Sequence, residues 1–310
     1  MRAARFVMEK ARAPSAEEAK FQYPMKIKMR DGYESEIIVH RPENPPEKSP
    51  LIVLLYGGGF IVGSNVQLGP YARALAKIYG ATAVTLSYRM APEEKFPAAP
   101  NDTWDSVKWL AEHASDIGAD CSAGFLLGGI SAGGNLTAVI AQKALDEKLS
   151  PPLTGLWVAI PVLLNEQNVP EKYKHRWFSR KQNEKAPIFN MSAIENVDKY
   201  LQQDESSPDW SPFNLKHAFD GTPPTYIQVC GMDPLRDDGL IYEQVLRDHG
   251  VKTKMDVYPG QPHAHWSYLP QLEASKQATA DTIVNFGWLL GVRPPSHEHV
   301  KASVAPPGGS

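Results

Sequence analysis

The sequence predicts an α/β fold, with an eight-stranded, mostly parallel sheet and helices on both of its faces. Short β-rich runs alternate with longer helical patterns through most of the chain, and this alternation is typical of parallel βαβ units. Several runs are continuously apolar, as expected for strands that are covered on both faces. Of the 310 residues, 42% are hydrophobic and 22% are charged, so the chain can bury the core of a single domain spanning 1–310.

The first two strands are expected at 25–30 and 35–41, as an antiparallel hairpin. Asp31-Gly32 separates them, and this dipeptide supplies the positive φ that a tight hairpin turn requires. Six further strands, which should form the parallel part of the sheet, are expected at 51–56, 82–87, 125–128, 153–160, 225–230 and 253–258. Helical patterns separate them or follow the last one, at 71–79, 101–114, 132–147, 235–249 and 272–290.

Three regions interrupt this rhythm. Residues 1–24 precede the hairpin, and residues 165–215 form a polar, Trp-containing stretch that is much longer than an ordinary connection. Both are predicted to contribute to a helical cap. Residues 293–310 are rich in Pro, Gly and Ser and lack periodicity, which predicts a flexible tail.

Composition and charge narrow the partners and the compartment. A formal charge of −3 gives no electrostatic reason to expect nucleic acid, and no stretch approaches the roughly 20 apolar residues that cross a bilayer. Charged residues near the N-terminus interrupt any signal-peptide core. The two cysteines, Cys121 and Cys230, border apolar runs and are interpreted as buried thiols, which favours a reducing, cytoplasmic setting. Small-molecule partners fit best, and an oligomer such as a homodimer is left open.

The motif Gly129-Ile130-Ser131-Ala132-Gly133 lies between the fifth expected strand and the helical pattern that begins at 132. It matches G-x-S-x-G, in which small residues allow a tight strand-to-helix turn that presents the serine hydroxyl at the helix N-terminus. The alternative is a turn that merely packs closely or cradles a phosphate. Because neither G-x-G-x-x-G nor a Gly-Lys-Ser/Thr ending occurs, the motif favours a nucleophilic Ser131.

A second glycine-rich segment, Tyr56-Gly57-Gly58-Gly59-Phe60, follows the third expected strand. A flexible glycine loop at this place can turn two backbone amides toward the oxyanion that develops during acyl transfer. Alone, the segment would be interpreted as a plain turn after a strand. Together with the G-x-S-x-G motif, it indicates acyl-transfer chemistry.

A nucleophilic serine needs a histidine as base and a carboxylate that orients the histidine. In α/β-hydrolase folds the three follow in the order serine, acid, histidine. Asp233 and His263 follow Ser131 in this order, directly after the seventh and eighth expected strands. Since the carboxyl ends of parallel strands lie at one edge of the sheet, the three side chains can converge there.

Several rival assignments accompany this one. Asp237 and Asp238 are also possible acids, but they fall inside the helix expected from 235 and are interpreted as surface charges. His265 competes evenly with His263 on sequence geometry. A catalytic thiol at Cys230 has no evident activating partner. His263 and His265 could also be two metal ligands, but no third ligand is identifiable, so neither a metal nor an organic cofactor is expected.

Four blocks of the sequence resemble the hormone-sensitive-lipase-like branch of the α/β-hydrolases, which includes bacterial, fungal and plant carboxylesterases. They are Tyr56-Gly-Gly-Gly-Phe60, Ser87-Tyr-Arg-Met-Ala-Pro-Glu93 with Phe96-Pro-Ala-Ala99, Gly129-Ile-Ser-Ala-Gly-Gly-Asn135, and Asp233-Pro-Leu-Arg-Asp237 with Pro262-His263. The resemblance covers about 50–290, and the chain looks most like fungal members. It implies that Asp233 is the acid and His263 the base. It also implies an oxyanion hole formed by the backbone amides of Gly58, Gly59 and Ala132.

The chain departs from the family pattern at three positions. Tyr56 replaces the usual histidine of His-Gly-Gly-Gly, Ile130 stands where an acidic residue is common, and His265 occupies a site that is usually aromatic. These residues, together with Phe60 and Trp266, are predicted to contact the substrate. Further aromatic candidates for lining the pocket are Trp177, Phe178 and Trp210.

The predicted activity is hydrolysis of a carboxylic ester or lactone through an acyl-enzyme on Ser131, with a small-molecule ester or acyl compound as substrate. One alternative is a natural-product tailoring enzyme that uses the same three residues for cyclisation, elimination or acyl transfer. Another is a non-catalytic small-molecule binding protein, like the related plant hormone receptors. The presence of all three residues argues against that alternative.

Overall fold

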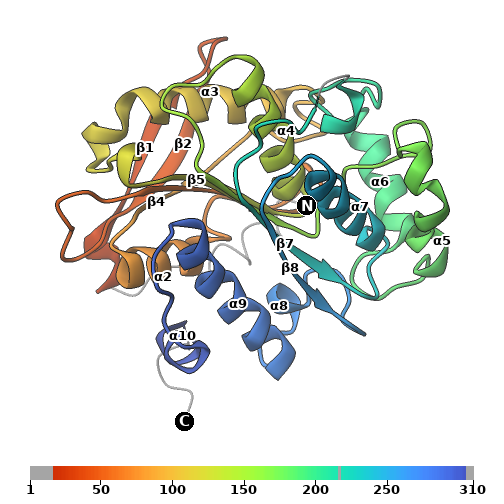
Figure 1. The fold of residues 1–310 in the computed structure, drawn as a ribbon. Coiled ribbons are helices and arrows are strands. Elements are labelled where there is room, and N and C mark those ends of the chain that lie inside the picture. Colours follow the sequence, from red (N-terminus) through yellow and green to blue (C-terminus); the bar gives the residue numbers. More distant parts are fainter. Residues whose placement is uncertain (1–16, 216–217, 305–310) are drawn as a thin grey trace.

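The computed structural model describes residues 17–215 and 218–304, and within them the expected strands form one mostly parallel eight-stranded sheet (Figure 1). The order across the sheet is β1-β2-β4-β3-β5-β6-β7-β8. The strands are β1 (Gln22–Lys28), β2 (Glu34–His40), β3 (Leu51–Leu55), β4 (Thr82–Leu86), β5 (Phe125–Ile130), β6 (Gly155–Ala159), β7 (Thr225–Cys230) and β8 (Thr253–Tyr258). The predicted fold class is confirmed.

The first two strands form the predicted antiparallel hairpin. Lys28 pairs with Glu34 at its closed end, and Gly32 in the turn has a φ of +87°, which glycine adopts without the clash that a Cβ would cause. β2 pairs antiparallel with β4, and the remaining neighbours are parallel. The parallel strands therefore end at one edge of the sheet.

Helices cover both faces of the sheet, as Figure 1 shows. One face packs against α3 (Ala98–His113), α4 (Ala132–Asp146) and α7 (Arg236–Asp248), and the other against α2 (Gly69–Tyr79) and α9 (Glu273–Leu289). These helices confirm the predicted ones, with shifted ends. α3 starts ahead of Pro100, because proline is tolerated in the first turn of a helix, where its missing amide has no intrahelical acceptor.

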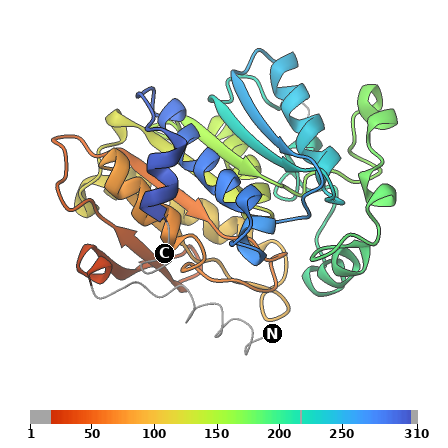
Figure 2. The same cartoon turned by 90° about the horizontal axis from the view of Figure 1, so that it is seen from below.

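The connection from β6 to β7 contains the irregular region 165–215, here called the insert. Its helical pieces are η4 (Glu171–Arg176), α5 (Ser179–Gln182), α6 (Met191–Leu201) and η5 (Pro212–Asn214). Figures 1 and 2 show α5 and α6 together at one side of the molecule. Of the other predicted cap region, residues 1–16 lie outside the described residues, and the rest leads through η1 (Glu18–Phe21) into β1.

The prediction of a flexible tail is wrong for part of 293–310. Residues His297–Val304 form α10, which packs beside α9 and α2. Val300 is fully buried in the core on that face, and His297 contacts the Asp281 carboxylate at 2.9 Å. Burial of an apolar side chain stabilises this helix. The sequence did not predict it, because the surrounding residues lack hydrophobic periodicity. Residues 305–310 lie outside the described residues.

Across the described ranges, no helix combines the length and the low polarity needed to traverse a bilayer.

Replacing Val300 tests whether α10 is part of the packed structure. Val300→Ala should lower the free energy of unfolding by about 1–3 kcal/mol, because it removes buried methyl groups and leaves a cavity. Urea unfolding followed by circular dichroism measures this. Val292→Ala is the matched control: Val292 is 48% exposed, so its replacement should change stability by less than about 0.5 kcal/mol. Equal effects of the two substitutions would contradict a docked α10.

Candidate active site

Ser131 lies at a tight turn between β5 and α4. Its φ is +57°, and its amide donates to the carbonyl of Ala159 at 2.8 Å. The turn needs glycine on both sides. A Cβ on Gly129 would lie 2.3 Å from the Gly133 carbonyl oxygen, and one on Gly133 would lie 2.1 Å from the Leu55 carbonyl oxygen. The small residues of the motif therefore let β5 and α4 approach β3 through backbone atoms.

The structure brings Ser131, His263 and Asp233 into one hydrogen-bonded chain. Nε2 of His263 lies 2.9 Å from Oγ of Ser131, and Nδ1 of His263 lies 2.6 Å from Oδ2 of Asp233. Each side chain follows the end of a different strand: Ser131 follows β5, Asp233 follows β7 and His263 follows β8. Since a carboxylate can only accept, Nδ1 carries the proton and Nε2 is free to accept one from the hydroxyl.

Burial and a backbone contact hold this chain in place. Ser131 is 8% exposed, His263 5% and Asp233 0%. The second carboxylate oxygen of Asp233, Oδ1, accepts from the amide of Leu235 at 2.8 Å. The orientation of His263 is therefore set by a buried carboxylate whose two oxygens both have donors.

The glycine loop after β3 lies beside Ser131. A Cβ on Gly57 would be 3.2 Å from Cβ of Ser131, and the Gly57 amide donates to Oε1 of Gln67 at 2.7 Å. Gly58 and Gly59 have φ values of +138° and +60°, which favour glycine. Their amides have no acceptor among the described residues. The amide of Ala132, the next residue after the serine, likewise has none within the described part of the chain.

Tyr56, which stands in place of the family histidine, is the residue before this loop, and it packs against Tyr88. Its ring stacks on Tyr88 with 4.3 Å between centroids. The two tyrosines also form reciprocal hydrogen bonds: the Tyr56 hydroxyl donates to the Tyr88 carbonyl at 3.2 Å, and the Tyr88 hydroxyl donates to the Tyr56 carbonyl at 2.9 Å. Tyr56 is 2% exposed, so it fixes the backbone at the start of the glycine loop.

The other predicted substrate contacts are buried. Phe60 packs on Trp210 in the core beneath α3 and α4. Ile130 and Trp266 belong to the core on the opposite face of the sheet. His265 is fully buried, and desolvation lowers its pKa. The role of these residues in substrate binding stays a prediction, as does that of Tyr56.

Neither thiol has the lowered pKa of a reactive cysteine. Burial raises the pKa of the Cys230 thiol well above its usual value, which disfavours the thiolate that a nucleophile requires. Cys121 is half-buried rather than buried, and its pKa is raised to about 11. In the ranges that the structure describes, no three or more His, Cys, Asp or Glu side chains are grouped to hold a metal ion.

Two residues of the insert lie over the site, and the sequence reasoning missed both. The ring of Phe189 stacks on the His263 imidazole, with centroids 4.6 Å apart. Val197, on α6, lies above the glycine loop, since a Cβ on Gly59 would meet its Cγ2 at 2.6 Å. The signal was weak because both contacts join segments far apart in the sequence, where neither periodicity nor a motif points to a partner.

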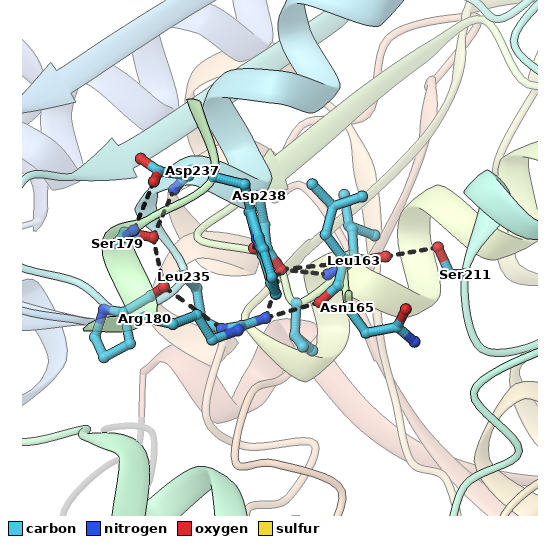
Figure 3. A network of polar contacts seen from close by, with 12 residues as sticks. Leu163, Asn165, Ser179, Arg180, Ser211, Leu235, Asp237 and Asp238 are labelled. Atoms are coloured by element: carbon cyan, nitrogen blue, oxygen red, sulfur yellow. Dashed lines mark hydrogen bonds and ion pairs between the residues drawn. The ribbon is translucent and has the colours of Figure 1, made fainter. Parts of the chain in front are cut away.

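The interpretation of Asp237 as a surface charge is wrong. It is 2% exposed, and its Oδ2 accepts from the amides of Phe178 at 2.7 Å and Ser179 at 2.6 Å (Figure 3). These amides belong to the start of α5, where a helix leaves backbone donors without intrahelical acceptors. Asp237 therefore fastens the insert to α7.

Asp238 is likewise a buried anchor, with 0% exposure. Its Oδ2 accepts from the amides of Leu163 at 2.9 Å and Leu164 at 3.0 Å. It also accepts from the Arg180 guanidinium at 3.0 Å, and Oδ1 accepts from the indole of Trp177 at 3.0 Å (Figure 3). The helical pattern predicted an exposed side chain here. The prediction failed because the insert covers the start of α7, which would otherwise face solvent.

Two effects act in opposite directions on the Asp238 carboxyl. Burial raises its pKa, while the guanidinium of Arg180 and the other donors oppose this rise. All of its contacts are with donors, and a protonated oxygen would need an acceptor instead. The geometry therefore corresponds to the ionised carboxylate.

The fold and the hydrogen-bonded serine, histidine and aspartate define an α/β-hydrolase. A family model described as alpha/beta hydrolase fold matches residues 52–267, and the chain belongs to this family.

Named relatives include enzymes that act on esters. An AB hydrolase superfamily protein of Schizosaccharomyces pombe is 36% identical over 265 residues, which cover 85% of this chain and 78% of the yeast protein. A versiconal hemiacetal acetate esterase of Dothistroma septosporum is 33% identical over 262 residues, covering 84% and 79%. The solved structure of a vibralactone cyclase is similar with a TM-score of 0.83 and 28% identity, over 91% of this chain and 83% of that one.

Replacing Asp238 tests the anchor between the insert and α7. Asp238→Asn should lower the free energy of unfolding by about 3–5 kcal/mol, because it leaves the Arg180 charge without its buried partner and turns an amide N–H₂, itself a donor, toward fixed donors. Urea unfolding measures the loss. Asp146→Asn is the control, since Asp146 is exposed at the end of α4. If both variants unfolded at the same urea concentration, Asp238 would not be an anchor.

Proposed function

We propose that this protein is a serine esterase that cleaves a carboxylic ester through an acyl-enzyme on Ser131. The observation that carries the proposal is the chain of two hydrogen bonds, 2.6 and 2.9 Å long, from Asp233 through His263 to the serine hydroxyl. The relationship to a fungal acetate esterase supports it. That relative also favours a role in secondary metabolism.

The first half of the reaction forms the acyl-enzyme. Oγ of Ser131 attacks the acyl carbon while its proton passes to Nε2 of His263, and the carbonyl π electrons move onto the carbonyl oxygen. Asp233 stabilises the resulting imidazolium. The backbone amides of Gly58, Gly59 and Ala132 would stabilise the oxyanion, since they have no acceptor among the described residues. Collapse of the tetrahedral intermediate breaks the ester C–O bond, and the imidazolium gives its proton to the leaving alcohol.

The second half regenerates the enzyme. Water loses a proton to Nε2 of His263 as its oxygen attacks the acyl carbon, and the same amides stabilise the second oxyanion. The bond to Oγ of Ser131 then breaks, the imidazolium returns the proton to the serine, and the acid leaves. These steps use only the side chains and amides named here, together with water.

A second candidate uses the same acyl-enzyme without water. The similarity to a vibralactone cyclase favours it. In that case a hydroxyl within the acyl group would replace water as the nucleophile, and its attack on the acyl carbon would release a lactone. The residues would keep their roles, and the choice between the two outcomes would depend on how well the site excludes water. A purely non-catalytic binding function is disfavoured by the intact hydrogen-bonded chain.

Removal of the nucleophile tests the proposal. Mixing the protein with p-nitrophenyl acetate should release about one equivalent of p-nitrophenol rapidly if deacylation is slow, or steady turnover if it is fast. Ser131→Ala and His263→Ala should each lower kcat/KM by about four orders of magnitude or more, because the three residues act as a unit. His265→Ala, at the rival position, should keep most of the activity. Wild-type protein without burst or turnover on activated esters would contradict esterase function.

Product analysis separates hydrolysis from cyclisation. With the p-nitrophenyl ester of 5-hydroxypentanoic acid in H₂¹⁸O, an esterase should release 5-hydroxypentanoic acid that carries ¹⁸O in its carboxyl group. A cyclase should release the unlabelled lactone, because the intramolecular hydroxyl attacks in place of water. Mass spectrometry distinguishes the two. Ser131→Ala corrects for the uncatalysed reaction, and lactone as the main enzymatic product would replace the esterase proposal by the cyclase one.

A further inference from the structure

One face of the His263 imidazole is covered by an aromatic ring from the insert. Phe189 stacks on it with centroids 4.6 Å apart and an interplanar angle of 29°. The two nitrogens of the imidazole are already engaged by Asp233 and Ser131. Phe189 therefore supplies a contact to the ring face that is independent of both hydrogen bonds.

A strained turn holds Phe189 in this position. Ile188 has a φ of +71°, and the amide of Phe189 donates to the carbonyl of Pro187 at 2.9 Å. Positive φ is exceptional for a β-branched residue, because its Cβ crowds the backbone. On the other side, Oδ1 of Asn190 accepts from the amide of Ala193 at 3.1 Å and caps α6. Strain of this kind persists only where surrounding contacts over-determine it, and it clusters at functional sites.

The insert is also bonded directly to the loop that orients His263. Nδ2 of Asn183, a few residues before the turn, donates to the carbonyls of Asp233 at 2.9 Å and Gly231 at 3.3 Å. The carboxylate that orients the imidazole and the segment that carries Phe189 thus belong to one hydrogen-bonded unit. Their relative position is fixed by more than the stacking itself.

The geometry points to Phe189 as a positioning residue that stabilises the protonated form of His263 during the reaction. This inference rests on the proposed function, in which His263 becomes an imidazolium when it takes the Ser131 proton. The face of an aromatic ring is electron-rich and attracts a cation stacked against it. The attraction is larger for the imidazolium than for the neutral imidazole, so it favours the charged state that forms on the way to the acyl-enzyme.

The surroundings of His263 allow this effect to be isolated. Among the described residues, the charged side chain in contact with the imidazole is Asp233, on the loop after β7. Ser131 approaches from the turn after β5, and the insert contributes the uncharged Phe189. His265, the first residue of α8 (His265–Tyr268), packs into the core on Trp266 instead. A substitution at Phe189 therefore changes the ring face without changing a neighbouring charge.

Two substitutions separate the aromatic face from simple coverage. Phe189→Leu keeps an apolar side chain over the imidazole but removes the ring, whereas Phe189→Tyr keeps the ring. The chain also offers a matched control, because Trp109 stacks on His113 of α3 with centroids 4.5 Å apart. Trp109→Leu makes the same type of change to an aromatic–histidine stack away from the site.

Two measurements report on the imidazolium. The first is the pH dependence of kcat/KM for p-nitrophenyl acetate, in which the acidic limb follows protonation of the base. The second is the titration midpoint of the His263 imidazole by NMR, with its signal identified by its disappearance in His263→Gln. The second measurement requires no catalytic turnover.

Phe189→Leu should move both the acidic limb and the NMR midpoint to lower pH by about half a unit, with kcat/KM lowered about two- to fivefold, because the charged form loses the attraction of the ring. Phe189→Tyr and Trp109→Leu should leave both midpoints at the wild-type value. A Phe189→Leu midpoint equal to that of the wild type, or an equal shift in Phe189→Tyr, would overturn the inference. Wild-type protein inactive on esters would refute the proposed function, and the NMR midpoints would still decide the role of Phe189.

Discussion

The close approach of backbone atoms beneath Ser131 is the constraint on which the rest of the site depends. A Cβ on Gly133 would lie 2.1 Å from the Leu55 carbonyl oxygen, so α4 can reach β3 only through glycine. This approach lets Ser131 turn at a φ of +57° between strand and helix. It also brings the loop after β3 beside the serine. Within the described part of the chain, the amides of Gly58 and Gly59 on this loop have no acceptor. The glycines of the two motifs thus allow the same close approach of β3, β5 and α4.

Three aspartates on the loop after β7 and at the start of α7 have three different roles. Asp233 accepts from His263, Asp237 accepts from the first amides of α5, and Asp238 accepts from Arg180 and the chain after β6. Each is buried, and each is satisfied by donors, as buried charge requires. The residue that orients the histidine and those that anchor the insert therefore share one short segment. The same insert carries Phe189, whose ring stacks on His263.

Most of the fold could be predicted from the sequence, because strand runs, helical periodicity and turn residues act over a few neighbouring positions. The hairpin at Gly32 and the parallel strands were found at the expected places. The errors arose where tertiary packing overrides local signals. α10 forms because Val300 is buried in the core. α3 begins before Pro100 rather than at the predicted residue 101, because a proline is tolerated in the first turn of a helix.

For the site, the sequence by itself determined the glycine turns and the order of serine, acid and histidine at strand ends, since these depend on backbone preferences and chain order. Only the tertiary structure decided which side chains meet. His263 and His265 are two positions apart, yet one reaches Ser131 and the other is buried near Cys230. Phe189 gave no local signal at all, because its contact with His263 joins an irregular insert to the loop after β8. A contact between distant segments exists only once both are folded.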